Sequence, residues 1–338
     1  MSKLIQIEFF FAILNMNKYI KFGLLLPFIS LLGLISISFT FYGELLLSFL
    51  PYAAVIYFIY MVVFSLLLVT NGADFKRANT YWINWFFVFM IFLGIFSFYF
   101  DLGVRASEPD SKPIKVISAN IWYQNEKIEQ IQSFFEKENA DILMLTEFTS
   151  DHYTALESYF DNNYKFQSIQ IDKLSFPYTG KVVFSKYPLT NEEISNHKFD
   201  ELFLENSVQV QDKTLNLVMV HTTAPVNVNY YYNRNAQLDY FRENIINNSV
   251  QNTLVTGDFN VSPWSPRFIE VDRHLNALSM NRVHTNEFDF TWKYNDNSFF
   301  KSHIDHTYIS EGLTTNAYEY KEFPGSDHKA QVFTLAFE

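Results

Sequence analysis

Thr253-Leu254-Val255-Thr256-Gly257-Asp258-Phe259-Asn260 is the stretch that decides how this chain of 338 residues folds and what chemistry it can perform. Its first four residues are apolar or β-branched and predict a buried strand. Asp258 and Asn260 follow at the C-terminal end of that strand, with both side chains on one face. An ionised carboxylate there can take a proton from water, and a neighbouring amide can hold an oxyanion or a phosphate oxygen. The stretch therefore predicts a hydrolytic site at the end of a strand.

The first 105 residues differ from the rest of the chain, because Phe, Leu, Ile and Val dominate them and charges are few. Three runs there contain no Lys, Arg, Asp or Glu. Each run reaches the length of about 20 apolar residues that a helix needs to cross a bilayer. We expect a membrane region over residues 1–105, with transmembrane helices at 23–42, 45–70 and 81–100, a turn around Gly43-Glu44 and a linker at 106–113. The sequence leaves open whether Met1 or Met16 is the true start.

Basic residues set the expected orientation of these spans. Lys3, Lys18 and Lys21 precede the first span, and Lys76 and Arg77 lie between the second and the third. The turn between the first two spans has no basic residue. The positive-inside rule then places the N-terminus in the cytoplasm, and three crossings place everything after residue 100 outside it. We therefore expect a multi-pass membrane protein whose soluble domain is extracytoplasmic.

Residues 114–338 alternate apolar and polar stretches in the manner of a soluble domain. Apolar residues at helical spacing predict helices at 126–138, from a cap at Asp151 to 160, at 231–247 and at 265–274. Strands are predicted at 115–121, 141–147, 166–171, 181–185, 202–210, 215–221, 253–256, 303–310 and 330–337. Strands outnumber helices, and strand–helix–strand units mix with direct strand–strand steps. This pattern indicates an α/β fold in which two mixed sheets pack face to face with helices outside.

Carboxylates and histidines stand at the ends of several of these strands. Glu147 closes the buried strand 141–147 and is the best first ligand for a hard divalent cation, which prefers carboxylate oxygens. Asp305 lies among several histidines, one of which it can orient through a hydrogen bond. In the adjacent pair Asp327-His328, one residue can meet a metal while the other meets a phosphate, and the sequence leaves open which does which. The absence of cysteine excludes disulfides and thiolate ligands.

Charge separates the two parts of the chain. Residues 1–105 carry six basic and four acidic groups, or +2, so the chain's total of −11 leaves −13 on the remainder. An acidic domain is poorly suited to gripping nucleic acid through nonspecific phosphate contacts. The same charge is compatible with a cation site, although solubility is the more common single cause of such a charge.

Six short blocks in the soluble domain resemble the endonuclease/exonuclease/phosphatase superfamily, in that family's order and at its approximate spacing. The resemblance covers residues 114–338. The blocks are Ser118-Ala119-Asn120, Leu145-Thr146-Glu147, Val220-His221-Thr222-Thr223-Ala224-Pro225, Gly257-Asp258-Phe259-Asn260, Ile304-Asp305-His306 and Gly325-Ser326-Asp327-His328. The preceding spans and the continuation Val261-Ser262-Pro263-Trp264-Ser265-Pro266 look like a membrane-anchored bacterial subgroup of that family, which implies an inner or plasma membrane location.

This resemblance implies a four-layered α/β sandwich with its site at one edge of both sheets. It implies Mg²⁺ as cofactor, with Mn²⁺ as a substitute, bound on the side of Glu147, Asp327 and Asn120. It implies that Asp258 orients or deprotonates the attacking water and that His328, paired with Asp305, is the catalytic histidine. Asn260 and His221 would contact phosphate oxygens. Asn125 and Trp264 are further candidates for substrate binding.

Two features narrow the implied activity. Repair enzymes of this family that act on apurinic sites carry an Asp two residues beyond the first Asn, where this chain has Trp122. His221 resembles the histidine of the deoxyribonuclease I, sphingomyelinase and phosphatase branches. Both features argue against DNA repair. Three consecutive aromatics, Tyr230, Tyr231 and Tyr232, can stack on a base, contact lipid or simply pack the start of a helix.

The sequence thus favours a membrane-tethered, Mg²⁺-dependent phosphodiesterase or phosphatase facing outward. Its expected partners are the lipid bilayer and a phosphoester substrate, whether lipid, small molecule or nucleic acid. No protein partner is predicted. One alternative is an outward-facing endonuclease that degrades external DNA or RNA. Another is a catalytically idle binding or sensing module on the membrane, which the full set of acid, amide and histidine side chains disfavours.

Overall fold

A computed structural model describes residues 113–171, 180–191, 203–246, 251–283, 289–295 and 300–338, together with 36–49 and single positions between 33 and 66. The chain divides into two compact units, Met1–Ser97 and Phe98–Glu338.

In the first unit, helix α3 (Phe41–Ser48) runs through the position where we expected a turn. Thr40 caps it by accepting a hydrogen bond from the backbone N–H of Gly43 at 3.2 Å. The break in helical structure falls at Ser38–Thr40 instead of Gly43-Glu44, because Thr40 satisfies an N–H at the new helix start. Among the described residues, no helix has the length and apolar character needed to cross a membrane. Of the expected spans, 23–42 and 45–70 lie partly outside the described residues, and 81–100 lies wholly outside them.

The second unit contains two six-stranded β-sheets. The first has the strand order β13-β14-β1-β2-β4-β3 and the second β5-β6-β7-β8-β12-β9. The strands of the first are β13 (Leu313–Glu322), β14 (Lys329–Phe337), β1 (Ile114–Asn120), β2 (Ile142–Thr146), β4 (Lys181–Ser185) and β3 (Phe166–Gln170). Those of the second are β5 (Leu189–Asn191), β6 (Phe203–Val210), β7 (Lys213–His221), β8 (Thr253–Asp258), β12 (Asp305–Ser310) and β9 (Met280–Val283). A separate short ribbon joins β10 (Trp292–Lys293) to β11 (Lys301–Ser302).

The two sheets share one pairing pattern. Each has a parallel pair at its centre, β1 with β2 and β7 with β8, and antiparallel strands on both sides. A parallel pair needs a crossover connection. Helix α6 (Ile128–Glu138) supplies it between β1 and β2, and helix α8 (Val228–Tyr240) between β7 and β8. Each sheet therefore presents two carboxyl-terminal strand ends side by side at one edge.

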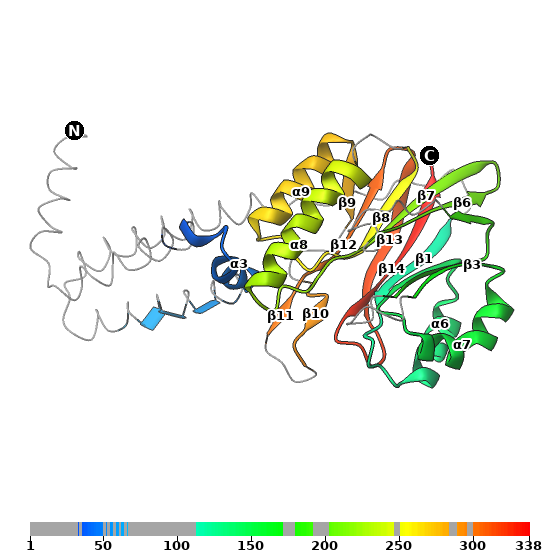
Figure 1. The fold of residues 1–338 in the computed structure, drawn as a ribbon, viewed down its shortest axis with the longest axis horizontal. Coiled ribbons are helices and arrows are strands. Elements are labelled where there is room, and N and C mark those ends of the chain that lie inside the picture. Colours follow the sequence, from blue (N-terminus) through cyan, green and yellow to red (C-terminus); the bar gives the residue numbers. More distant parts are fainter. Residues whose placement is uncertain are drawn as a thin grey trace, which may run out of the picture. The chain divides into compact units, whose positions relative to one another are not determined.

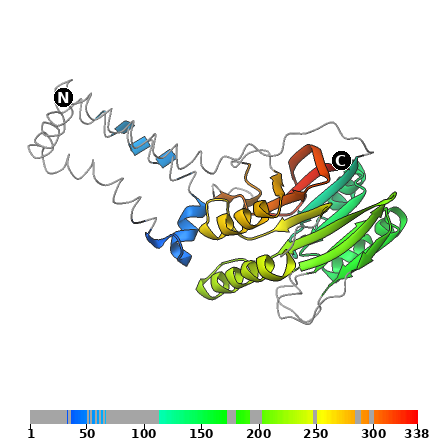
Figure 2. The same cartoon turned by 90° about the horizontal axis from the view of Figure 1, so that it is seen from above.

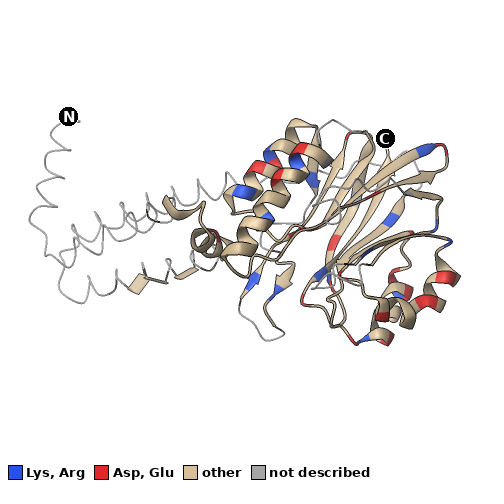
Figure 3. Cartoon of the chain, viewed as in Figure 1, with Lys and Arg blue, Asp and Glu red and all other residues tan. Residues whose placement is uncertain are grey.

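Helices cover the outer face of each sheet. Helices α6 and α7 (Ser150–Asn163) pack on the first sheet, while α8 and α9 (Pro266–Ala277) cover the second (Figure 1). Figure 2 shows the sheets layered between these helix pairs. Three buried apolar clusters fill the three interfaces, one between the sheets and one under each helix pair. The domain is thus a four-layered α/β sandwich. Charged side chains gather on the outer helices and are sparse on the strands (Figure 3).

Local sequence patterns predicted most of the helices and strands, and the differences described next have physical reasons. Thr149, not Asp151, caps α7, because its side chain accepts from the N–H of His152 while the His152 ring accepts from the N–H of Thr149. The expected helix 231–247 begins earlier, at Val228, where Asn227 caps it, and gives way to a π-helical turn at Phe241–Ile245. The ten-residue strand β13 escaped prediction because it is an edge strand rich in polar side chains.

Candidate active site

Strand register brings the polar residues of the second sheet to one edge. His221 ends β7 directly beside Asp258, which ends the parallel neighbour β8. Asp305 opens β12, which runs antiparallel to β8, and so it also lies opposite Asp258. Three residues separated by long stretches of chain therefore meet on adjacent strands.

The first sheet contributes its residues in the same way. Asn120 ends β1 beside Thr146, and Glu147 follows directly after β2. His328 stands just before β14, which runs antiparallel to β1, so it reaches the same edge. Asn120 links the two sheets, because its Nδ2 donates hydrogen bonds to Glu147 Oε1 at 2.9 Å and to Asp258 Oδ2 at 3.1 Å.

The backbone at this edge is unusual. Trp122, Glu147 and Asn260 have φ angles of +62°, +55° and +50°, in the left-handed region that non-glycine residues seldom occupy. Gly257 has φ +140°, and a Cβ there would meet Val220 O at 2.1 Å. Strained backbone of this kind gathers at functional sites, where the surrounding structure holds it. Here it turns the chain sharply after β2 and β8, so that Glu147 and Asn260 face the site.

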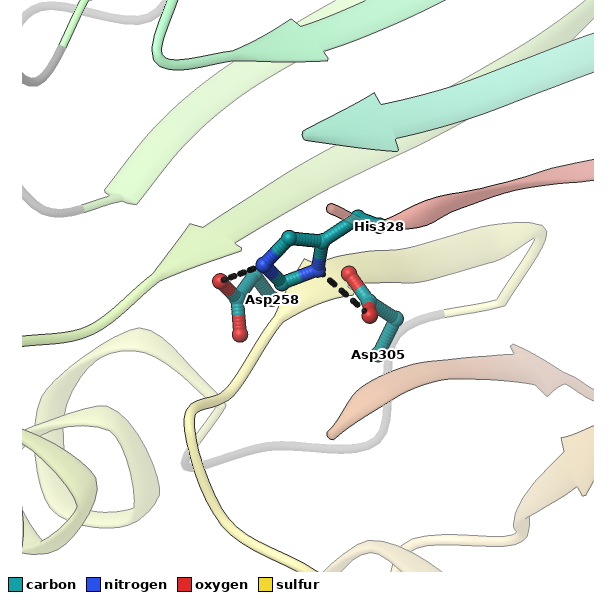
Figure 4. Close-up of side chains that lie close together, drawn as sticks. All are labelled: Asp258, Asp305 and His328. Atoms are coloured by element: carbon teal, nitrogen blue, oxygen red, sulfur yellow. Dashed lines mark hydrogen bonds and ion pairs between the residues drawn. The ribbon is translucent and has the colours of Figure 1, made fainter. Parts of the chain in front are cut away.

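His328 lies between two carboxylates (Figure 4). Its Nδ1 bonds to Asp305 Oδ2 at 2.9 Å, and its Nε2 lies 3.7 Å from Asp258 Oδ2. Burial lowers the pKa of His328, but the charges of Asp305 and Asp258 outweigh it and raise that pKa well above its usual range. Burial raises the pKa of Asp258, against the opposing charge of His328. His328 is therefore an imidazolium at neutral pH, held by one carboxylate and presented to the other.

Two groups fix the Asp258 carboxylate from its other side. The backbone N–H of Asn260 donates to Asp258 Oδ1 at 2.9 Å, and the Asn260 amide donates to Asp258 Oδ2 at 3.2 Å. The amide also donates to Thr222 O at 2.8 Å, which ties it to the chain beyond His221. Asp258 and Asn260 thus share one face, as the spacing predicted, although a left-handed turn rather than an extended strand brings them together.

The carboxyl group of Glu147 has a lowered pKa. Burial raises its pKa, but His221, whose Nε2 lies 3.6 Å from Oε1, and the Asn120 amide outweigh it and lower the pKa to about 2. The backbone N–H of Tyr123 donates to the other oxygen at 3.1 Å. Glu147 is therefore a carboxylate at every physiological pH, as a ligand for a hard cation must be.

Asp327 feels the charge of this carboxylate and is linked to a different element. Its Oδ2 accepts from Trp292 Nε1 at 2.8 Å, and its carbonyl accepts from the N–H of Lys293 at 2.9 Å. Burial raises the pKa of Asp327, and the charge of Glu147 adds to that rise. Two mutually repelling carboxylates on one side of the site form an environment that a divalent cation would relieve.

The donor set fits a divalent cation. Four carboxylates meet at this edge, from Glu147, Asp258, Asp305 and Asp327, against the single charge of the His328 imidazolium. Two of the four, Glu147 and Asp327, do not take part in the contacts that link Asp258, His328 and Asp305. The Asn120 amide is turned with Nδ2 toward Glu147, and its oxygen accepts from Trp122 N–H at 3.0 Å, so in this arrangement it orients the carboxylates.

Helix α8 holds both strand-end loops through side chains that the sequence did not single out. The fully buried Arg234 donates from Nη1 to Asn260 O at 2.6 Å. Gln237, one helical turn later, accepts from Thr223 N–H and donates to Thr223 Oγ1, both at 2.7 Å. The only available signal was an Arg and a Gln three apart on a predicted helix, too weak to mark a site. These contacts couple the loop after His221 to the loop that carries Asp258.

The two residues expected to bind substrate are placed differently. Asn125 is buried, and its Nδ2 donates to the carbonyls of Ile121 and Pro324 while its oxygen accepts from Lys127 N–H. The contact of Asn125 with substrate stays a prediction, and in this structure its amide joins two loops. Trp264 is only 2% exposed, so its indole lies within the packing beyond the β8 turn. Its contact with substrate stays a prediction, although that burial favours a packing role.

Comparison with known proteins agrees with this architecture. Residues 117–328 match the model of the Endonuclease/Exonuclease/phosphatase family. No curated protein matches the chain. Among solved structures, the human Nocturnin catalytic domain with bound sulfate anion superposes with a TM-score of 0.51 at 18% identity, over 70% of this chain and 96% of that one. D. rerio TDP2 complexed with single strand DNA product superposes with a TM-score of 0.50 at 16% identity, over 67% of this chain and 99% of that one. The endonuclease/exonuclease/phosphatase from Beutenbergia cavernae DSM 12333 superposes with a TM-score of 0.50 at 14% identity, over 67% of this chain and 72% of that one. At these identities the superpositions show the shared fold.

Proposed function

The chain belongs to the Endonuclease/Exonuclease/phosphatase family, whose members are generally hydrolases of phosphoester bonds, and from that premise we propose a divalent-metal-dependent phosphoester hydrolase tethered to a membrane. One observation carries the proposal. The line Asp258–His328–Asp305 faces the pair Glu147–Asn120 across one edge of the sandwich. A base, a cationic hydrogen-bond donor and a cation ligand are the groups that attack of water on phosphorus requires.

Asp258 is the group that takes the proton from water. Its carboxylate lies at the strand end with both oxygens fixed, one by the N–H of Asn260 and the other by the amides of Asn260 and Asn120. A base held by three donors keeps its direction while its proton is transferred. Burial raises the pKa of Asp258 toward the operating range of a general base.

His328 supplies positive charge beside the reacting phosphate. Asp305 accepts from its Nδ1, which leaves Nε2–H to point toward Asp258 and the site. An imidazolium in this position stabilises charge on a phosphoryl oxygen in a buried environment. His221 and the Asn260 amide lie on either side of Asp258 and serve as further contacts for phosphate oxygens.

Glu147 and Asp327, with Asn120 beside them, are the residues that would hold Mg²⁺ or Mn²⁺. The bound cation would neutralise charge on the phosphoryl and leaving oxygens. The depressed pKa of Glu147 supports this assignment, because it keeps that carboxylate ionised.

The sequence supports the remaining parts of the proposal. Three uncharged apolar runs before residue 101 support a membrane tether, and the distribution of Lys and Arg supports an outward-facing domain in a bacterial inner or plasma membrane. The net charge of −13 on residues 106–338 favours a lipid or small phosphoester over nucleic acid as substrate.

The proposal is tested with the full chain, purified in detergent and assayed on bis(p-nitrophenyl) phosphate and p-nitrophenyl phosphate. We expect hydrolysis of at least one ester with Mg²⁺ or Mn²⁺, its loss in EDTA, and its return when either metal is restored. Turnover that persists after complete chelation would refute the metal assignment. Absence of turnover on both esters, and on lipid, sugar phosphate, DNA and RNA with either metal, would refute the hydrolase.

A further inference from the structure

Exposed apolar side chains of the catalytic domain are concentrated on two segments. Among the described residues from 113 onward, seven large apolar side chains are exposed. One of them, Ile169, lies on the edge strand β3. The other six are Val226, Val228, Tyr230, Tyr232, Tyr294 and Phe300. Scattered single apolar residues are ordinary on a protein surface, whereas a group of them marks an interaction site.

Both segments are attached to the active-site edge. Residues 226–232 begin α8, which starts seven residues after His221, and Gln237 of that helix bonds Thr223 of the intervening loop. Tyr294 and Phe300 flank the β10–β11 ribbon, whose Trp292 pairs with His328 and bonds Asp327. Figure 1 shows this ribbon and α8 at the same end of the sandwich. Both groups of exposed side chains therefore belong to elements that are bonded to the loops of the site.

The structure also separates the three consecutive tyrosines. Tyr231 is 1% exposed and packs beneath α8, while Tyr230 and Tyr232 are 44% and 63% exposed. Packing of the helix start explains Tyr231 alone. The outward pair has the amphipathic character, apolar ring and polar tip, that places tyrosine at boundaries between an apolar phase and water.

The charge around these side chains is unlike that of the domain. Residues 224–232 carry no charge, and in the segment 289–302 the charges of Lys293 and Lys301 balance those of Asp289 and Asp296. The domain as a whole carries −13. The two segments are thus close to neutral in an acidic domain, which suits contact with an apolar layer.

The length of the tether restricts what this surface can meet. The last uncharged run ends at Phe100 and β1 begins at Ile114, which leaves residues 101–113, or 13 residues, between them. Fully extended, 13 residues reach roughly 45 Å. A folded domain of this size is about equally wide. On the proposed topology, the domain cannot move more than about its own diameter from the bilayer.

We propose that Val226, Val228, Tyr230, Tyr232, Tyr294 and Phe300 form a bilayer-contact surface, and that the site acts on phosphoesters in lipid headgroups. This inference rests on the proposed function. The apolar side chains of both segments enter the headgroup boundary, so that Asp258, His328 and Glu147 meet a lipid phosphate without extraction of the lipid from its layer.

The contact is tested by lipid quenching in the full chain, which contains no cysteine and therefore accepts one unique label. Tyr232→Cys and Phe300→Cys are labelled with a nitrobenzoxadiazole dye and reconstituted into phosphatidylcholine–phosphatidylglycerol vesicles with nitroxide-labelled lipid. Ile169→Cys is the matched control, since it is exposed and apolar but lies on the edge strand β3, outside both segments. We expect strong quenching at 232 and 300 and little at 169. Equal quenching at all three, or none at 232 and 300, overturns the contact surface.

The substrate is tested by hydrolysis. The double variant Tyr232→Ser, Phe300→Ser is expected to lose about tenfold or more of its activity on vesicle phospholipid, because apolar burial in the layer is lost, while hydrolysis of bis(p-nitrophenyl) phosphate is unchanged. Ile169→Ser is expected to keep both activities. A wild-type chain that cleaves the soluble ester but no lipid overturns the lipid assignment and leaves the proposed function intact. A chain that cleaves nothing fails the proposed function, while the quenching still decides the surface. Dye changes with oligothymidine and not with lipid would assign the aromatics to base stacking and overturn the inference.

Discussion

At the scale of single residues, the site depends on a histidine held between two carboxylates. Asp305 fixes one ring nitrogen of His328 and Asp258 faces the other. The two carboxylates have different tasks because their surroundings differ. Asp305 is paired closely with the imidazolium, whereas Asp258 is held by the amides of Asn120 and Asn260 and can accept a proton from water.

Removing either partner should slow the chemical step. We expect Asp258→Asn and His328→Ala each to lower kcat by at least about 10²-fold, since each removes a group used in the transition state. Asp212→Asn, in the exposed turn between β6 and β7, is the control and should leave kcat unchanged. Steady-state kinetics on the ester that the wild type cleaves best will decide. Near-normal turnover in either variant rejects the role assigned to that residue.

Gly257 is the residue whose backbone permits His221 and Asp258 to meet. Its φ of +140° suits glycine alone, and a Cβ would lie 2.1 Å from Val220 O on the neighbouring strand. We expect Gly257→Ala to destabilise the fold by about 2–4 kcal/mol and to lower kcat of the remaining folded protein, because β7 and β8 must separate at the site.

The matched control is Gly312→Ala. Gly312 also has positive φ, at +85°, but it lies in the turn after β12, at the end of that strand opposite to Asp305. This variant should lose stability without a change in the kcat of the folded fraction. Thermal unfolding combined with active-site-normalised kinetics separates the two, and equal kinetic effects would contradict the explanation for Gly257.

At the scale of elements, a buried carboxylate joins three of them. Glu138, the last residue of α6, accepts from Lys115 of β1 at 2.9 Å and from Lys321 of β13 at 2.9 Å to both of its oxygens. Burial raises the pKa of Glu138, but its hydrogen bonds and charge interactions with Lys321 and Lys115 outweigh it and hold the pKa below its usual value. This network fixes the end of the helix that makes the β1–β2 crossover.

The Glu138 network makes a pH-dependent contribution to stability. Its folded pKa is lowered, so its contribution is present above the pKa of the unfolded carboxyl and is lost as pH falls through the folded value. We expect Glu138→Gln to cost about 1–3 kcal/mol at pH 7 and progressively less in acid. Denaturant unfolding of both proteins across pH 3–7, which brackets the ordinary Glu pKa of about 4, measures this difference. Glu129→Gln on the exposed face of α6 is the control. A difference that stays constant with pH would contradict it.

At the scale of the whole molecule, the site depends on how the chain enters the sandwich. The family domain begins within β1, and on the proposed topology the apolar runs before it set the side of the membrane on which the site works. We expect an alkaline phosphatase reporter fused after Ser107 to be active in intact bacteria, and a reporter that requires the cytoplasm to be inactive at the same point. A fusion after Lys76 is the control and should show the reverse. Cytoplasmic activity after Ser107 would overturn the outward orientation.

Local patterns explain how much of the fold could be predicted. The buried runs at β2 and β8 and the helical spacing in α6 are visible in short windows, because burial of a strand or a helix face dictates which positions are apolar. The edge strand β13 could not be predicted, because its polar sequence lacks the apolar pattern of a strand. It forms a strand because it pairs with β14. The roles of Arg234 and Gln237 were equally hidden, because their partners lie on loops of two other strands.

The sequence by itself determined the family, the strand-end position of Glu147 and Asp258, and the acidic character of the domain, because these properties belong to single segments. Only the tertiary structure decided that Asn120 joins Glu147 to Asp258, 138 residues away in sequence, and that Asn125 is spent on loop contacts. It also placed Tyr232 outside and Tyr231 inside. The physical reason is that strand register and helix rotation, which no local window contains, set the distances between side chains from different segments. The motif Gly257-Asp258-Phe259-Asn260 thus predicted a strand-end site, and the pairing of β8 with β7 and β12 assembled it.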